Sequence, residues 1–293
     1  MIQGIIIKAL SGFYDVLADD QIYTCKGRGL FRKKKVTPLV GDYVEVEPQS
    51  DSTGTIVSIE DRRNALIRPP IANIDQAIIV SSVVEPDFNP LLLDRFLVLI
   101  EYKDIEPLIV LTKEDLTTEQ QLEQLNDYAN IYRGIGYQVL IVSKIMDDLD
   151  EKIYPHLANK LSVIAGQSGV GKSTLLNKLD DDLDIETANI SKSLGRGKHT
   201  TRHVELYEIG NGYVADTPGF SSLDFNEIEL EDLRFCFREF LEYQDMCKFR
   251  GCLHINEPKC AVKEAVQNEE IASFRYEHYE NFYEEIKQRK PRY

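Results

Sequence analysis

A glycine-rich segment in the middle of the chain has the composition of a phosphate-binding loop. It comprises Gly166, Gln167, Ser168, Gly169, Val170, Gly171, Lys172, Ser173 and Thr174. The glycines let successive backbone N–H groups turn toward bound phosphates, and the helix expected at 172–179 adds its positive N-terminal end. Lys172 would place a charge on the phosphates, and the Ser173 hydroxyl would bind Mg²⁺. A chance glycine-rich turn is the alternative, but the apolar run 161–165 and the following helix supply the context of a phosphate loop.

A carboxylate that could assist the same chemistry lies in the segment from Asp216 to Gly219, after the apolar run 213–215. Asp216 would hold Mg²⁺ through water, and the Gly219 amide would meet the terminal phosphate. The stretch 195–202 is glycine-rich and aperiodic, as expected of a loop that orders around the phosphate and Mg²⁺. Thr200 or Thr201 should complete the metal shell, and their spacing does not decide between them. The alternative for the segment 195–202 is a flexible surface loop, and the alternative for Asp216 to Gly219 is an ordinary turn at the end of a strand.

A second motif, which precedes the phosphate loop, could recognise the base of a nucleotide. Thr112, Lys113, Glu114 and Asp115 follow the apolar run 107–111. The Asp115 carboxylate can accept from guanine N1–H and the 2-amino group, a pair that adenine does not present. Thr112 stands where most GTPases have asparagine, and Ser143 lies where GTPases carry the loop that caps the base. A solvated turn after a strand is the alternative.

The order of these motifs is base recognition, phosphate loop, the first switch (195–202) and the second switch (216–219), the two switches being the loops expected to order around the terminal phosphate. Because the phosphate loop comes first in an ordinary small GTPase, the sequence predicts a circularly permuted one. The surrounding pattern agrees with a mostly parallel sheet, since apolar strands alternate with amphipathic helices. The expected strands are 76–84, 107–111, 137–142, 161–165 and 213–215, and the expected helices lie near 90–102, 119–132 and 172–179.

A cysteine and histidine cluster near the C-terminus has the ligand set of a metal site. Cys247, Cys252, His254 and Cys260 lie within 14 residues. Three thiolates and one imidazole fill a tetrahedron and leave no position for water, which suits one structural Zn²⁺. Disulfides are the less favoured alternative, because three cysteines would leave one thiol unpaired. Helices are expected on both sides of the cluster, at 229–243 and 271–287. Cys25 and Cys236 have apolar surroundings and should be buried.

The first 60 residues contain five short strand-like runs, which predict a small barrel. The runs are 4–9, 14–17, 21–25, 43–47 and 54–59, and glycine, aspartate and proline separate them. An oligonucleotide-binding (OB) barrel is one such architecture. An SH3-like barrel or a purely structural module fits the pattern nearly as well.

The charge of the chain is unevenly distributed. The formal net charge is −15, yet residues 1–70 carry +1 and residues 71–225 carry −12. Because nucleic-acid affinity comes largely from Lys and Arg, an RNA contact is expected first at Lys26, Arg28 and the basic run 32–35. A solvated loop is the alternative for that run. No apolar stretch approaches the roughly 18 residues needed to span a bilayer, and the N-terminus has no signal-peptide pattern. We therefore expect a cytoplasmic protein without membrane contact.

Together these motifs resemble the ribosome small-subunit-dependent GTPase A family (RsgA-like), and the resemblance covers essentially the whole chain. Its strongest marks are the segments 166–177, 197–201 and 216–220 and the cysteine and histidine cluster. The resemblance implies a multidomain α/β protein. Its parts would be an OB-fold RNA- and ribosome-binding barrel at 1–62, a circularly permuted P-loop G domain at 63–225 and a helical zinc-binding domain at 226–293.

The resemblance also implies a function. It implies GTP hydrolysis with Mg²⁺, stimulated by the small (30S) ribosomal subunit and its rRNA, which assists late maturation of that subunit. Phe220 replaces the glutamine that orients water in familiar GTPases, so intrinsic hydrolysis should be slow. His199 is the family's candidate for that role, and an exposed loop histidine is the alternative. Arg202 stands where the family often has a third threonine, which leaves the metal-binding threonine open.

Two alternative hypotheses for the function predict different nucleotide behaviour. A non-catalytic RNA-binding assembly factor would use GTP or GDP only as a structural ligand. An ATP-dependent enzyme would prefer ATP, whereas Asp115 favours GTP. We expect a monomer.

Overall fold

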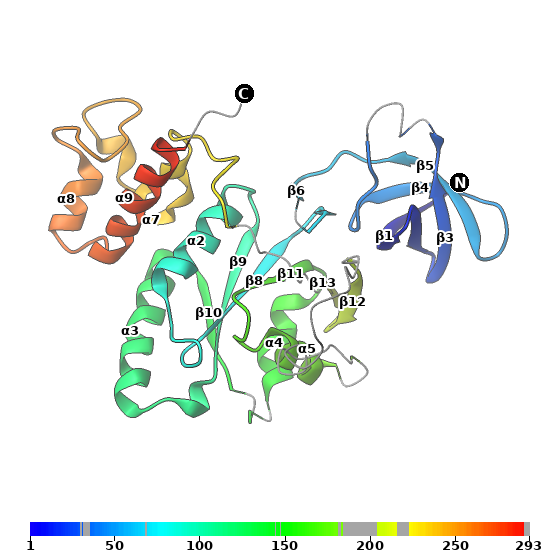
Figure 1. The fold of residues 1–293 in the computed structure, drawn as a ribbon, viewed down its shortest axis with the longest axis horizontal. Coiled ribbons are helices and arrows are strands. Elements are labelled where there is room, and N and C mark those ends of the chain that lie inside the picture. Colours follow the sequence, from blue (N-terminus) through cyan, green and yellow to red (C-terminus); the bar gives the residue numbers. More distant parts are fainter. Residues whose placement is uncertain are drawn as a thin grey trace. The chain divides into compact units, whose positions relative to one another are not determined.

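The computed structural model describes residues 1–29, 31, 36–67, 69–143, 145–146, 148–180, 183, 204–215 and 223–289 (Figure 1). The chain forms two compact units. Unit 1 consists of Met1–Ile78 and Lys144–Ser222, and unit 2 consists of Ile79–Ser143 and Leu223–Tyr293. Each unit therefore combines segments that are far apart in the sequence. In particular, the C-terminal region shares a unit with the segment that carries the base-recognition motif.

The N-terminal part of unit 1 is a closed five-stranded barrel, drawn in blue in Figure 1. Its strands are β1 (Ile2–Leu10), β2 (Phe13–Ala18), β3 (Gln21–Gly27), β4 (Tyr43–Pro48) and β5 (Thr53–Ile59). Their order is β1-β2-β3-β5-β4, in which β3 and β5 pair in parallel and the other neighbours are antiparallel. Alternate residues face the interior, where Ile6, Val16 and Ile56 are completely buried. The predicted OB-type barrel is confirmed, and each of its five predicted runs is a strand.

Buried polar contacts join the barrel to the rest of unit 1. Arg62 binds the fully buried Asp42 carboxylate through two hydrogen bonds of 2.7 and 2.8 Å. Gly41 has φ +86°, and a Cβ atom there would lie 2.1 Å from the Ala72 carbonyl oxygen, so the close approach requires glycine. A short hairpin of β6 (Ala65–Leu66) and β7 (Ile71–Ala72) follows the barrel.

The remaining strands form a six-stranded sheet of order β10-β9-β8-β11-β13-β12. They are β8 (Gln76–Ser82), β9 (Glu106–Thr112), β10 (Gln138–Ile141), β11 (Leu161–Ala165), β12 (Leu206–Ile209) and β13 (Gly212–Ala215). In unit 2, β9 and β10 are parallel; in unit 1, β11 and β13 are parallel and β12 is antiparallel to β13. Almost every residue of β8, β9 and β11 is buried, as expected of strands covered on both faces. The five predicted strands are confirmed, and the four-residue β12 is an addition.

Helices connect these strands, and three of those described lie at the positions that the sequence pattern predicts. They are α2 (Pro90–Glu101), α3 (Glu119–Ile135), α4 (Leu149–Leu157) and α5 (Lys172–Leu179). Asn89 caps α2 by accepting a hydrogen bond from the Leu92 N–H, and Thr118 and Gln121 form a capping box at the start of α3. The short helix α4 was not predicted, and it contains Pro155, a residue that normally argues against a helix interior. No helix among the described residues is both long enough and apolar enough to cross a membrane.

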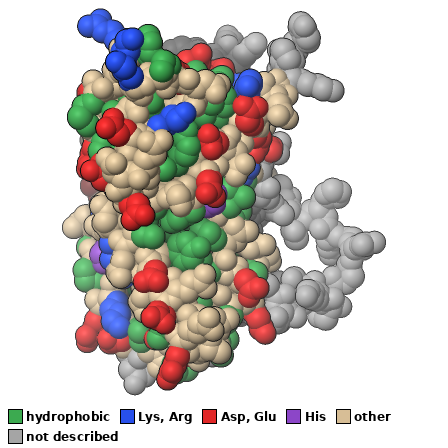
Figure 2. Space-filling view, turned by 90° about the vertical axis from the view of Figure 1, so that its left-hand side faces the viewer, with side chains coloured by type: hydrophobic (Ala, Val, Ile, Leu, Met, Phe, Trp, Pro, Cys, Tyr) green, Lys and Arg blue, Asp and Glu red, His purple; other side chains and the backbone are tan. Residues whose placement is uncertain are grey.

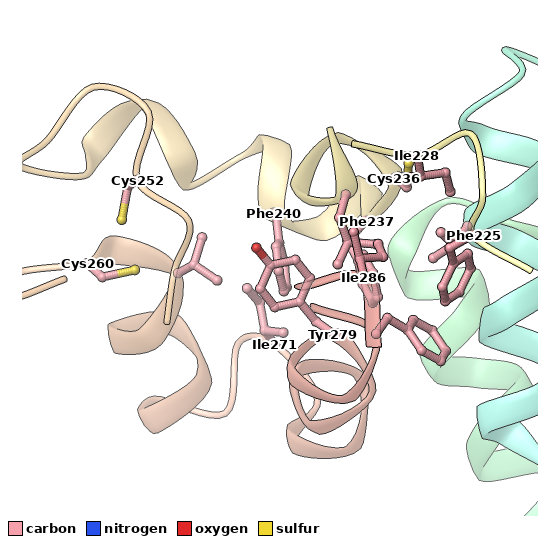
Figure 3. Close-up of a cluster of buried hydrophobic side chains, with 14 of the residues drawn as sticks. Phe225, Ile228, Cys236, Phe237, Phe240, Cys252, Cys260, Ile271, Tyr279 and Ile286 are labelled. Carbon is pink, nitrogen blue, oxygen red and sulfur yellow. The ribbon is translucent and has the colours of Figure 1, made fainter. Parts of the chain in front are cut away.

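The C-terminal region of unit 2 is helical, but its first part is not the continuous helix expected at 229–243. It contains three short pieces, η2 (Leu233–Cys236), α7 (Arg238–Leu241) and η3 (Gln244–Met246), followed by α8 (Ala261–Gln267) and α9 (Ser273–Lys287). The break occurs at Phe237, which has the extended dihedrals φ −114° and ψ 98°. Its ring packs against Phe240 and Tyr279 in a buried aromatic cluster (Figure 3). Tertiary packing therefore outweighs the helical periodicity.

A buried ionic cluster holds the C-terminal helices against α2 and α3. Arg275 of α9 donates two hydrogen bonds to Glu239 of α7, at 2.7 and 3.1 Å, and a third to Asp94 of α2. The same Asp94 accepts from Tyr132 of α3 at 2.6 Å. Arg275 and Asp94 are both 0% exposed. The pKa of Arg275 lies well above its ordinary value, because the two carboxylates outweigh the effect of its burial. These contacts bind four helices of unit 2 together.

Candidate nucleotide and metal sites

The phosphate-loop segment lies in unit 1, between β11 and α5. Gly169 and Gly171 have φ values of +87° and +99°, a region that favours glycine, and Val170 between them is buried. The Lys172 ammonium bends back over the loop and donates to the carbonyls of Gly166 and Gln167, at 2.9 and 2.8 Å. The local fold is strand, glycine-rich turn and helix. Lys172 and the N-terminus of α5 can therefore act on one anion.

The base-recognition segment lies in unit 2, where β9 ends. Lys113 has the left-handed φ of +63°, and the 3₁₀ turn η1 (Glu114–Leu116) begins directly after it. The Lys113 ammonium donates to the Glu85 carbonyl. Asp115 Oδ1 is buried and has no hydrogen-bond partner among the described residues. A buried carboxylate oxygen without a donor costs free energy, so this atom is prepared to accept a hydrogen bond from a ligand.

Other predicted nucleotide residues are found in or beyond the described segments. Thr112 and Ser143 are both buried, and the Thr112 hydroxyl donates to the Ser81 carbonyl at 3.4 Å. Ser173 and Thr174 lie in the first turn of α5, where Ser173 is half-buried. The predicted roles of His199, Thr200, Thr201, Asp216 and Gly219 concern residues outside the described part of the chain.

The four predicted metal ligands come together in the C-terminal region of unit 2. The ligand atoms of Cys247, Cys252, His254 and Cys260 all lie within 4.8 Å of one another. His254 Nδ1 is 3.6 Å from Cys247 Sγ and 3.3 Å from Cys260 Sγ, and these two sulfurs are 3.9 Å apart. A tetrahedral Zn²⁺ with zinc–sulfur bonds of about 2.3 Å would separate its ligands by about 3.8 Å. The observed distances fit a metal site of this kind.

The protonation chemistry of the cluster also suits a metal. Burial, followed by the charge of Arg234, lowers the pKa of His254 to about 4, so its imidazole is neutral and able to bind a cation. Burial raises the pKa of the Cys252 and Cys260 thiols, which a bound metal would reverse by stabilising the thiolates. All five cysteines, which lie in the described part of the chain, are free of disulfides. Figure 3 shows the Cys252 and Cys260 sulfurs pointing toward one another.

Residues that the sequence analysis did not select surround the ligand loop. The side chains of Arg234, Tyr276 and Tyr279 donate hydrogen bonds to consecutive backbone carbonyls of the loop. They lie 18 to 26 positions away in the sequence, and nothing in their local pattern indicates a contact with the cluster. Glu257 is the exception, because its position inside the loop could have suggested a role.

Charge on the surface agrees with the acidic composition. On the face shown in Figure 2, Asp and Glu side chains are spread among apolar and neutral ones over most of the visible surface. In the barrel, by contrast, the Lys26 ammonium lies 4.8 Å from the centre of the Phe13 ring, and Phe13 is 44% exposed. A basic and an aromatic side chain are thus exposed together on the strand pair β2–β3.

The fold and these two sites define a class of protein: a circularly permuted P-loop GTPase that carries an N-terminal OB-like barrel and a C-terminal Cys₃His cluster. The chain belongs to the RsgA GTPase family. The model of this family matches residues 59–226, and the model of the RsgA N-terminal domain matches residues 3–56. The protein is therefore an enzyme that hydrolyses GTP.

Individual relatives resemble the chain along its whole length. A protein of Oceanobacillus iheyensis named small ribosomal subunit biogenesis GTPase RsgA 2 is 65% identical over 293 residues, which is 100% of both chains. The corresponding RsgA of Bacillus cytotoxicus is 58% identical with the same coverage. Among solved structures, YloQ, described as a circularly permuted GTPase, has a TM-score of 0.87 and 50% identity, over 100% of this chain and 97% of its own. YjeQ from Thermotoga maritima has a TM-score of 0.87 and 36% identity, over 99% of each chain.

Proposed function

We propose that this GTPase binds the small ribosomal subunit and hydrolyses GTP to assist its late maturation, and that the subunit stimulates hydrolysis. The observation that carries the proposal is the full-length match to relatives named small ribosomal subunit biogenesis GTPase. A match confined to the G domain would support GTP hydrolysis alone. The barrel and the C-terminal region are matched as well, and these are the parts available for contacts with a large partner.

Each motif has a proposed role in nucleotide binding. The segment from Gly166 to Thr174 binds the phosphates, with the loop amides and Lys172 opposing their charge. Ser173, Asp216 and one of Thr200 and Thr201 hold Mg²⁺, which would neutralise charge on the phosphates. Gly219 contacts the terminal phosphate. Thr112, Lys113, Glu114, Asp115 and Ser143 form the base-recognition side.

Exchanging the base-recognition carboxylate should change nucleotide preference. Asp115→Asn replaces an acceptor of two guanine hydrogen bonds with an amide that also donates, so affinity for GTP should fall by about 100-fold. Affinity for XTP should rise, because xanthine has an oxygen where guanine has its amino group. Competition binding with GTP, XTP and ATP measures both effects. Asp127→Asn, the same exchange at an exposed position of α3, is the matched control, and unchanged GTP binding by Asp115→Asn would contradict the assignment.

His199 is proposed as the group that positions the attacking water, in place of the glutamine replaced by Phe220. Hydrolysis of GTP should be slow for the protein alone and should accelerate when purified small subunits are added. In His199→Ala that acceleration should be lost, while GTP binding is retained, because the imidazole acts on water and not on the nucleotide. Phosphate release, measured with and without subunits, tests both statements. Equal stimulation of the variant and the wild type would remove His199 from the mechanism, and no stimulation of either would oppose the ribosomal proposal.

The Cys₃His cluster and the N-terminal barrel also have proposed ligands, a zinc ion and rRNA respectively. The Cys₃His cluster holds one structural Zn²⁺, since its donors and spacing match tetrahedral coordination and leave no open position. The barrel contacts rRNA, and the exposed Phe13 with Lys26 offers a ring for stacking and a charge for phosphate. The proposed boundaries are 1–62, 63–225 and 226–293. The protein is proposed to act as a cytoplasmic monomer.

Family membership favours a catalytic role over a non-catalytic assembly factor that uses the nucleotide only as a structural ligand. The Asp115 carboxylate oxygen, which has no hydrogen-bond partner in the described part of the chain, supports GTP rather than ATP as the ligand.

A further inference from the structure

The loop that carries His254 has its backbone carbonyls bound by side chains from other elements. The carbonyls of four consecutive residues, 252–255, each accept one hydrogen bond. Their donors are Arg234 at 2.9 Å, Tyr279 at 2.6 Å, Tyr276 at 2.7 Å and Lys263 at 2.8 Å, in that order. These donors belong to η2, α9 and α8, so three separate elements fix one short loop.

The N–H groups of the same loop are bound by a single carboxylate. Glu257 accepts from Leu253 at 2.8 Å through Oε1, and from Ile255 and Asn256 at 3.0 and 3.1 Å through Oε2. Burial raises the pKa of Glu257, but the backbone donors outweigh burial, so the net pKa is below its ordinary value. The carboxylate is therefore ionised and makes charge-assisted hydrogen bonds, which are about twice as strong as neutral ones.

These contacts hold His254 in a backbone conformation that it would not adopt readily by itself. Its φ is +60°, in the left-handed region, which costs a residue other than glycine of order 1 kcal/mol or more. In this conformation Nδ1 faces the sulfurs of Cys247 and Cys260. None of the seven hydrogen bonds uses a metal-ligand side chain. The ligand geometry is thus enforced by groups that do not themselves bind the metal.

We propose that Glu257 is a positioning residue that keeps the His254 loop in its metal-binding conformation before the metal arrives. The inference rests on the zinc site proposed above. Small zinc modules are commonly unfolded without metal, because the metal supplies most of their folding free energy. Here a core of buried side chains that includes Phe237, Phe240 and Tyr279 lies beside the loop and can keep the region folded (Figure 3). Zinc binding then requires little ordering of the chain.

The test is a zinc titration of the reduced, metal-free full-length protein in competition with a chromophoric chelator. Glu257→Gln keeps the size of the side chain but presents an amide N–H₂ to at least one loop N–H, and should weaken zinc binding by about 10–100-fold. Tyr276→Phe, which removes a single donor to the His254 carbonyl, should weaken it in the same direction but by less. Glu264→Gln, the same charge change on the exposed side of α8, should leave the affinity unchanged.

Hydrogen exchange of the metal-free wild type is a second, independent measurement of whether the loop is ordered before zinc binds. Amides of residues 253, 255 and 256 should stay protected without zinc in the wild type and lose protection in Glu257→Gln. The inference is overturned if Glu257→Gln binds zinc as tightly as Glu264→Gln, or if these amides are unprotected in the metal-free wild type. Failure of the zinc site itself looks different, because the wild type would then take up no zinc equivalent at all.

Discussion

Replacing Lys172 with alanine is expected to reduce kcat/KM for GTP by about 100-fold to 10,000-fold. A charge-assisted hydrogen bond contributes about 1.5–3 kcal/mol, and the lysine of a phosphate loop makes two such contacts, each 1.36 kcal/mol being tenfold in rate. The Lys172 ammonium already lies over the loop, bound to the Gly166 and Gln167 carbonyls. Little reorientation is therefore needed to reach a phosphate that enters the loop.

Lys178→Ala is the matched control for this experiment. Lys178 lies on the same helix, α5, and its ammonium donates to the Met146 carbonyl rather than to the loop. Its loss should change GTP hydrolysis by less than about threefold, since it lies in the last turn of α5, at the end opposite the phosphate loop. Steady-state hydrolysis, with GTP affinity measured separately, distinguishes lost binding from lost catalysis. A Lys172→Ala protein with a rate close to that of Lys178→Ala would show that the segment is not the phosphate site.

The second large effect concerns stability. Arg275→Ala is expected to destabilise unit 2 by about 3–5 kcal/mol, because it leaves the buried Asp94 and Glu239 carboxylates without their shared cation. The Arg275 guanidinium also lies 4.7 Å from the centre of the Phe237 ring, so the truncation opens a space in the aromatic cluster. Because α2, α7 and α9 meet at this residue, all three should lose protection together.

Native-state hydrogen exchange measures this effect helix by helix, which suits a chain with more than one compact unit. Lys287→Ala on the same helix is the control, because its ion pair with Glu284 is solvent-exposed and should contribute nothing measurable. Arg275→Ala and Asp94→Asn should be strongly non-additive, since each removes the same contact. Independent, additive effects, or protection lost in α9 alone, would contradict the role assigned to the cluster.

Elements with a strong local signal could be predicted. The apolar runs that became β8, β9 and β11 are buried on both faces, and the capped helices α2 and α3 begin where the Asn89 and Thr118 caps place them. The expected helix at 229–243 was wrong because Phe237 extends the backbone to reach the aromatic cluster. Helix α4 was not predicted because it is short and contains Pro155, a residue that argues against a helix interior.

The residues of the candidate sites also fall into two groups, those that the local sequence identifies and those that only the tertiary structure reveals. The four metal ligands could be identified because residue type and short spacing along the chain are enough to recognise a ligand set. The structure brings all four together: Cys247, Cys252, His254 and Cys260. The donors Tyr276 and Tyr279 were not identified, because a backbone hydrogen bond can be made by many residue types from many positions. Glu257 was also missed, although its position inside the loop could have suggested a role.

The sequence by itself determined the residue types and their order: a glycine-rich loop of phosphate-binding composition, a carboxylate proposed to select guanine, a permuted motif order and a set of four candidate metal ligands. These features are local, since glycine dihedrals, charge and ligand type belong to single residues or short segments. Tertiary structure alone decided what supports them. The cluster of Asp94, Glu239 and Arg275 joins positions up to 181 residues apart, and the buried environment that makes it strong exists only after the helices pack.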